Sequence, residues 1–176
     1  RYTPRKANAD GRLRPWCALV VVKPGEIAKD EPARPDRALG AVTLKAETPM
    51  PDLAQAWAWA HVQVSGDDDV PLATLLATSP ERCRARLLCA RRLAANTSYV
   101  ALLVPTFEVG RRAGLREGMG ALDALEPAWT TVNGMLEDAL ELPVYYRWQF
   151  STGAAGDFES LIRRVTPRLL PPTVGT

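Results

Sequence analysis

Two uninterrupted apolar runs constrain the fold of this chain more than any other feature. Residues 16–22 (WCALVVV) are followed by Pro24 and Gly25, and residues 99–104 (YVALLV) are followed by Pro105. Short runs rich in β-branched residues and bounded by turn residues are typical of strands that are buried on both faces. We therefore expect a core built around these two strands.

Weaker patterns predict the other elements, in which strands and short helices interleave. Strands are expected at residues 39–45, 61–64, 86–90 and 142–150, and helices at 53–60, 70–78, 107–113, 121–125, 128–140 and 158–165. The 15 prolines predict irregular loops between them, the longest at residues 24–38. The expected fold class is therefore α+β, with a mixed β-sheet, short peripheral helices and Pro-rich loops.

Three local patterns carry more detailed expectations. Asp52 is a suitable N-cap for the helix at 53–60. Gly114 suits the position just past the end of the helix at 107–113. The period of two in the strand at 142–150 places Val144, Tyr146, Trp148 and Phe150 on one face, and Tyr145, Arg147 and Gln149 on the other.

The length of 176 residues fits a single domain with a core of its own. Residues 1–15 and 166–176 are polar or Pro-rich, and we expect them to be extended terminal arms or linkers. The first residue is Arg1 rather than Met, which favours a segment excised from a longer protein. No apolar run approaches the roughly 20 residues of a membrane span, so no span is expected.

Composition and spacing exclude several classes of function. The 22 basic and 20 acidic residues nearly balance, so the net charge does not indicate a nucleic-acid partner. The single His excludes a site that needs two imidazoles. Cys17, Cys83 and Cys89 match neither a disulfide framework nor the close ligand pairs of a structural zinc site. Phosphate-binding glycine motifs are absent. We therefore expect no cofactor and no metal site, and unpaired thiols fit synthesis in the cytoplasm.

The densest basic cluster is a candidate contact surface. Arg82, Arg84 and Arg86 recur at a spacing of two residues, and 18 of the 22 basic residues of the chain are Arg. Such a cluster is most often a solvated or acid-paired face, and no aromatic residues interleave with it as in a nucleic-acid patch. We interpret it as a surface for charge pairing with another protein segment.

Two further sets of side chains support alternative functions. His61 is the only imidazole and is therefore the candidate base of a hydrolase or transferase of unfamiliar type, with a carboxylate or Cys as its partner. No nucleophile motif accompanies it. A carbohydrate- or peptide-binding module would use the large rings of Trp57, Trp59, Tyr145 and Trp148. That reading requires at least two of these rings to be exposed together.

Several stretches resemble a family of long, uncharacterised bacterial proteins associated with phage-tail-like contractile injection systems. The resemblance rests on residues 12–16 with 18–22, 58–63, 99–108, 110–111, 113–115, 142–148, 150, 152–153 and 156–159. It covers nearly the whole chain and implies a part of a larger assembly. The family offers no catalytic motif to carry over.

Together these observations predict a non-enzymatic structural or interaction module of a larger bacterial protein. Its partners would be other protein segments or subunits of a large assembly, with no nucleic acid and no membrane span. The unpaired thiols fit synthesis in the cytoplasm, and the resemblance implies a place in a released or membrane-docked particle of the phage-tail-like kind.

Overall fold

The structure is a computed structural model that describes residues 9–66, 69–121, 123–154, 162–163 and 165. The described residues form strands, α-helices and 3-10 helices in an α+β arrangement. The strands are β1 (Cys17–Val22), β2 (Ile27–Glu31), β3 (Gly40–Leu44), β4 (Ala60–Val64), β5 (Cys83–Leu87), β6 (Ser98–Pro105), β7 (Leu140–Val144) and β8 (Tyr146–Ser151). The helices are α1 (Leu72–Thr78), α2 (Glu108–Leu115) and the 3-10 turns η1 (Pro24–Glu26), η2 (Leu53–Trp59) and η3 (Pro80–Arg82).

The two apolar runs pair with each other, as strands, in the first sheet. Its order is β1-β6-β8, and both pairings are antiparallel. The register of β1 on β6 runs from Cys17 opposite Pro105 to Val22 opposite Val100. Almost every residue of both strands is buried, which explains why the runs lack the alternation of a half-exposed strand.

The second sheet has the order β2-β3-β7 and is also antiparallel. The strand expected at 39–45 is present as β3. The expectation of a loop at residues 24–38 is wrong in part, because that range contains β2. The sequence of β2, IAKDE, has little apolar content because β2 is an edge strand whose middle residues are exposed.

The aromatic strand expected at 142–150 is broken at Tyr145. Its first part, β7, belongs to the second sheet, and its second part, β8, belongs to the first. The Tyr145 N–H donates to Leu103 O at 2.9 Å while Tyr146 pairs with the same residue, the two-against-one arrangement of a β-bulge. The bulge shifts the alternation, so Val144 is buried and Tyr146 is 65% exposed. The expectation that these two share a face along one strand is therefore wrong.

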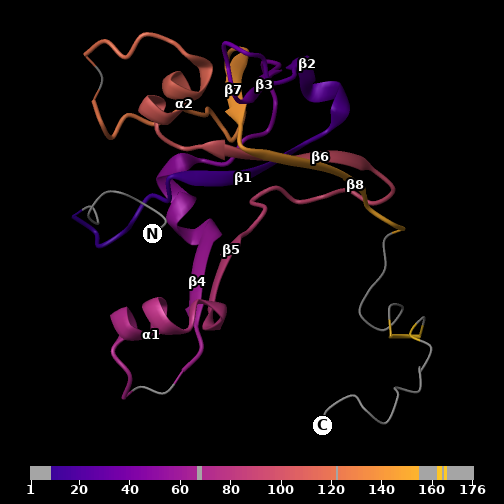
Figure 1. The fold of residues 1–176 in the computed structure, drawn as a ribbon. Coiled ribbons are helices and arrows are strands. Elements are labelled where there is room, and N and C mark those ends of the chain that lie inside the picture. Colours follow the sequence, from indigo (N-terminus) through magenta and orange to yellow (C-terminus); the bar gives the residue numbers. More distant parts are fainter. Residues whose placement is uncertain (1–8, 67–68, 122, 155–161, 164, 166–176) are drawn as a thin grey trace.

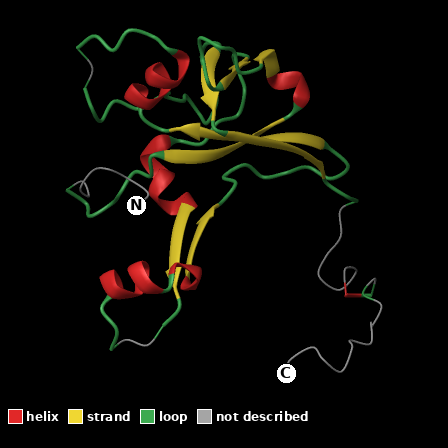
Figure 2. Cartoon of the chain, in the orientation of Figure 1, coloured by secondary structure: helices red, strands yellow, loops and turns green. Residues whose placement is uncertain are grey.

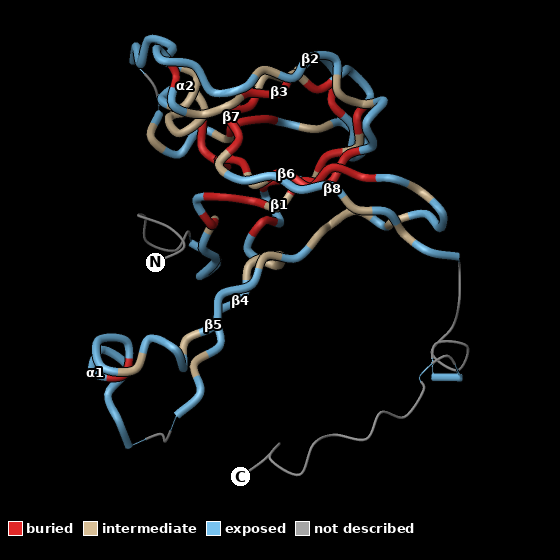
Figure 3. Tube along the Cα trace, turned by 45° about the vertical axis from the view of Figure 1, so that its right-hand side comes forward, coloured by how far each residue is buried: buried red, intermediate tan, exposed pale blue. Residues whose placement is uncertain are grey.

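The main core lies between the two sheets. It contains the inward residues Val20, Val22, Val42, Leu44, Leu102, Val104, Leu142 and Val144. Figure 1 shows β3 and β7 crossing the direction of β1 and β6, and Figure 3 shows the buried segments gathered there. The expected mixed sheet is therefore wrong. The described strands form three separate antiparallel sheets, and the bulged strand passes from one to the next.

The segment between α2 and β7 is irregular, so the helices expected at 121–125 and 128–140 are wrong over the described residues. Trp129 and Leu136 are buried in the core. Trp129 Nε1 donates to Pro51 O at 2.9 Å, and the Leu136 N–H donates to Thr48 O at 3.1 Å. These bonds to a distant segment replace the local hydrogen bonds of a helix.

Helix α2 runs one residue beyond Gly114, so the expected end at that glycine is wrong. The helix ends instead at Leu115, and the following residue, Arg116, caps it with a left-handed φ of 64°. Gly114 is needed for packing, since a Cβ there would lie 2.6 Å from Cβ and Cγ of Pro143 on β7. Figure 2 shows the helices at the margins of the sheets, as expected. Residues 1–8 and 166–176, and most of the helix expected at 158–165, lie outside the described residues.

Candidate interaction surface

A hairpin with a helical tip projects from the two-sheet body. It comprises residues 60–87, with β4 and β5 as its strands and α1 and η3 at its far end, and we call it the arm. Figures 1 and 3 show it leaving the body, and most of it is coloured as exposed. Asp52, as predicted, caps η2 just before the arm by accepting the Ala54 N–H at 2.8 Å.

The arm strands pair only with each other among the described strands, and their register creates two chemically different faces. Val62 lies opposite Ala85, and Val64 lies opposite Cys83. The alternate pairs are polar: His61 lies opposite Arg86, and Gln63 opposite Arg84. Directly opposed residues share a face of an antiparallel pair, so one face is apolar and the other is basic. The three central residues of each strand are exposed.

The arginine cluster predicted from the sequence lies on this arm. Arg82, Arg84 and Arg86 are all exposed. Arg86 Nη1 donates to Gln63 Oε1 at 2.7 Å. No salt bridge to these three guanidinium groups is found within the described part of the chain, in contrast to Arg91, whose Nη1 lies 2.6 Å from Glu26 Oε2. The cluster therefore presents positive charge on the exposed surface of the arm.

The tip of the arm is held by a very small buried contact. Leu75 of α1 is 4% exposed and packs over Gly66, where an added Cβ would meet Leu75 Cδ1 at 2.6 Å. Its neighbours Leu72 and Leu76 are 58% and 49% exposed. Isolated hairpins and short helices are marginally stable in water, so the arm gains from any partner that covers its apolar residues.

His61 lies in the middle of β4 and is exposed. Its Nε2 is 3.0 Å from Ala58 O, a backbone partner three residues earlier. Within the described residues, no hydrogen bond or ion pair brings a carboxylate or a thiol to this ring. The structure thus places His61 on an open surface rather than in a cleft with a second catalytic group.

The four rings proposed for ligand binding lie in different environments. Trp57 on η2 is 41% exposed and carries the Arg12 guanidinium 4.5 Å above its ring. Trp59 and Tyr145 are half-buried. Trp148 is exposed, and its nearest described ring is that of Tyr146, at 5.9 Å between centroids.

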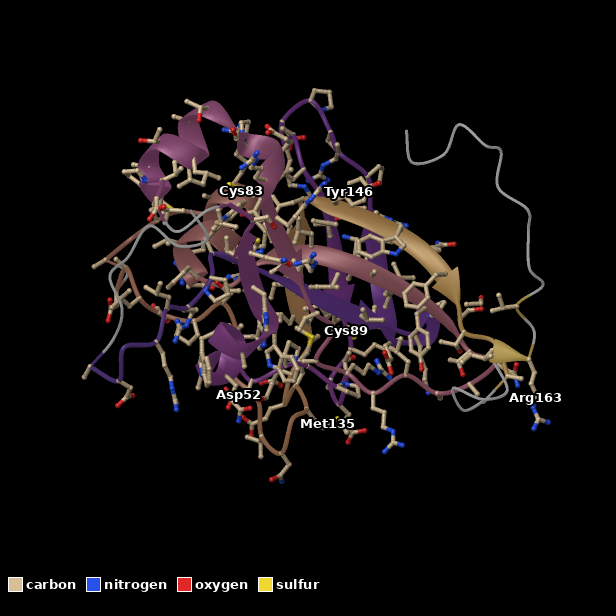
Figure 4. The ribbon with its side chains drawn as sticks, turned by 90° about the horizontal axis from the view of Figure 1, so that it is seen from below. Asp52, Cys83, Cys89, Met135, Tyr146 and Arg163 are labelled. Carbon is tan, nitrogen blue, oxygen red and sulfur yellow. The ribbon has the colours of Figure 1, made fainter. Side chains whose placement is uncertain are left out.

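Sequence reasoning missed Tyr146 as a surface residue, because the bulge at Tyr145 reverses which side chains point out. Figure 4 labels Tyr146 at the start of β8. It also missed Val62 and Leu72 as exposed apolar residues of the arm. Their alternating and helical patterns indicate amphipathic elements, but the patterns do not reveal that these side chains stay exposed among the residues that the structure describes.

The thiols do not converge on one site. Cys17, Cys83 and Cys89 are all free, and Figure 4 shows Cys83 and Cys89 well apart. Burial raises the pKa of the Cys17 thiol to about 11. A search of the described residues finds no group of three or more His, Cys, Asp or Glu side chains placed to hold a metal ion. Within the same residues, no helix is long and apolar enough to cross a membrane.

Comparisons with known proteins give no relative from which a function can be transferred. No family model, no curated protein and no solved structure matches this chain. The functional argument therefore rests on the exposed arm and on the surfaces of the body.

Proposed function

We propose that this chain is a structural or interaction module of a larger bacterial assembly, and that the arm is its docking element. One observation carries the proposal: residues 60–87 form an amphipathic hairpin that is exposed on both faces. The resemblance described above extends the proposal to a component of a phage-tail-like contractile particle.

The apolar face and the basic face of the arm suit different parts of one partner. Val62 is 58% exposed, and covering such a side chain contributes about 1 kcal/mol. Arg84 and Arg86, on the opposite face, favour a partner that presents carboxylates and speed its approach. A partner that contacts both faces of the arm therefore gains free energy from apolar burial and from charge attraction.

The test is co-sedimentation of the full chain with a large assembly from its host. Val62→Thr keeps the shape of the side chain but adds a hydroxyl to the apolar face of the arm. Its matched control is Val132→Thr, because Val132 is 49% exposed but lies on the body. Arg84→Glu tests the basic face, and Arg116→Glu at the end of α2 is its control.

The proposal predicts that the wild-type chain and both control variants sediment with the assembly. The two arm variants should be depleted from that fraction while their far-ultraviolet circular dichroism stays unchanged. Equal recovery of the arm variants and their controls would show that the arm is not the docking element. Recovery of the wild-type chain only as a small free species would reject the assembly role itself.

A further inference from the structure

The free edge of β1 is a second candidate site, separate from the arm. β1 is the end strand of the first sheet. The Thr106 N–H donates to Trp16 O at 3.1 Å. In an antiparallel ladder every second residue forms a hydrogen-bonded pair, so Ala18, Val20 and Val22 also direct their backbone N–H and C=O groups towards β6. The intervening residues must then direct their N–H and C=O groups away from β6.

A side-chain contact supports this assignment. Arg91 Nη1 donates to Val21 O at 3.2 Å from the side opposite β6. By the same alternation, the N–H and C=O of Leu19 also point outward. Within the described residues no strand pairs with this edge. Because the Val21 carbonyl is already bonded to Arg91, the N–H and C=O of Leu19 are the outward groups that remain for an added strand.

The edge of β1 is unlike the other edges of the body, because it carries no charge. Its sequence is CALVVV, whereas the edge strand β2 reads IAKDE. Charged side chains on β2 protect it from pairing with another chain. The edge of β8 is crossed by Arg147, whose Nη1 lies 2.6 Å from Asp30 Oδ1 on β2. β7, the other edge strand of the second sheet, carries Glu141, so among the described edge strands of the body only β1 has no charged residue.

A cavity of about 240 Å³ lies directly beside this edge. It is lined by Leu19 and Val21 on one side, and by residues 49–51, residues 90–92 and Gly134 on the others. We call it the strand-edge groove. A separate and much smaller space of about 10 Å³ lies nearer Cys17, between η2 and Leu88. The strand-edge groove is large enough for side chains of a bound strand, since one water takes about 30 Å³.

The positive charge of the strand-edge groove favours an acidic occupant. Among its lining residues are Arg91 and Arg92 but no Asp or Glu. Arg91 is paired with Glu26, whereas Arg92 is exposed and no salt bridge to it is found within the described residues. Strand β5 of a second copy would bring Arg84 and Arg86 towards these positive charges and is therefore disfavoured.

We propose that the strand-edge groove binds an extended peptide with acidic side chains, which adds a strand to β1. Its backbone pairs with Leu19, an apolar side chain enters the cavity, and a carboxylate meets Arg92. This is independent of the arm, so either proposal can fail without the other.

The test is fluorescence anisotropy with the full chain and a labelled synthetic peptide. The probe is a peptide of about six residues that alternates valine and glutamate. The control probe alternates valine and lysine. We expect binding of the acidic probe to be at least about tenfold tighter, and Arg92→Glu to abolish that preference while Arg116→Glu leaves it intact. Equal binding of the two probes, or no binding at about 1 mM, would reject the proposal.

Two changes separate strand addition from charge attraction alone. N-methylation of the peptide amides that face β1 should remove binding, and N-methylation of the alternate amides should not. Leu19→Pro removes one outward N–H without touching the ladder to β6, and it should weaken binding at least about tenfold. Binding that survives both methylation patterns would overturn the proposal. So would a concentration-dependent dimer lost in Leu19→Pro, because it would make a second copy the occupant.

Discussion

Replacing Gly114 by Ala should destabilise the protein, although the same change stabilises most exposed helices. In a helix interior, Ala is favoured over Gly by about 1 kcal/mol. Here the new Cβ would lie 2.6 Å from Cβ and Cγ of Pro143, and 3.4 Å from Leu39 Cδ1. Because the proline ring is rigid and buried in β7, either α2 or the strand must shift.

The expected magnitude follows from two opposing terms. Overpacking of this kind costs about 1–3 kcal/mol, and the gain in helix propensity offsets about 1 kcal/mol of it. With a rigid partner we expect a net loss of about 1–2 kcal/mol, which lowers the melting temperature by about 2–8 °C for a chain of this length. Equilibrium unfolding in urea, followed by circular dichroism, measures the change.

Two control variants isolate the cause. Ala113→Gly, at an exposed position in the same helix, should cost about 1 kcal/mol through propensity alone. Pro143→Gly removes the ring that clashes, so the double variant with Gly114→Ala should be more stable than the sum of the single effects. A Gly114→Ala protein that is more stable than the wild type would refute the packing argument.

Two other predictions concern ionisable groups. Glu108, 7% exposed, accepts from Arg111 Nε and Arg112 Nε, both at 2.7 Å, and the Arg111 hydrogen bond lowers its pKa below the ordinary 4.5. Glu108→Gln should therefore cost about 1.5–3 kcal/mol near neutral pH, the usual contribution of hydrogen bonds to a charged group. This stabilisation is present above the ordinary value and is lost as pH falls through the lower native pKa, so urea midpoints of variant and wild type should converge in acid. A difference that stays constant would contradict the ion-pair account. Cys17 is 4% exposed with a pKa of about 11, so iodoacetamide should label the half-buried Cys83 first, as read by peptide mass spectrometry. Faster labelling of Cys17 in the folded protein would contradict its burial.

The parts of the fold that were predictable are those with a strong local signal. The apolar runs that became β1 and β6 must be buried wherever they lie, so their strand identity follows from composition and flanking prolines. Asp52 as a cap and the start of α1 after Pro71 follow equally from local hydrogen bonding and backbone restriction. The strand at β4 was visible from its period of two.

The errors arose where distant contacts override local preference. β2 has a poor strand sequence but gains its ladder from β3. The segment around Trp129 was predicted to be helical, but the Trp129 indole and the Leu136 N–H bond to the distant residues Pro51 and Thr48. The sequence singled out the arginine cluster, but it did not predict that the cluster lies on a projecting hairpin. Arg84 and Arg86 lie on an arm because no other described strand pairs with β4 or β5, which is a property of the whole arrangement.

By itself, the sequence determined the class of the fold and the two strands at its centre, since burial of apolar runs needs no knowledge of their partners. Only the tertiary structure decided which edges stay open. The bulge at Tyr145 divides one strand between two sheets, and β1 is the end strand of the first. Whether a strand edge is paired depends on segments distant in the sequence, so the local sequence of the strand cannot predict it. The exposed arm and the strand-edge groove therefore follow from topology rather than from any motif.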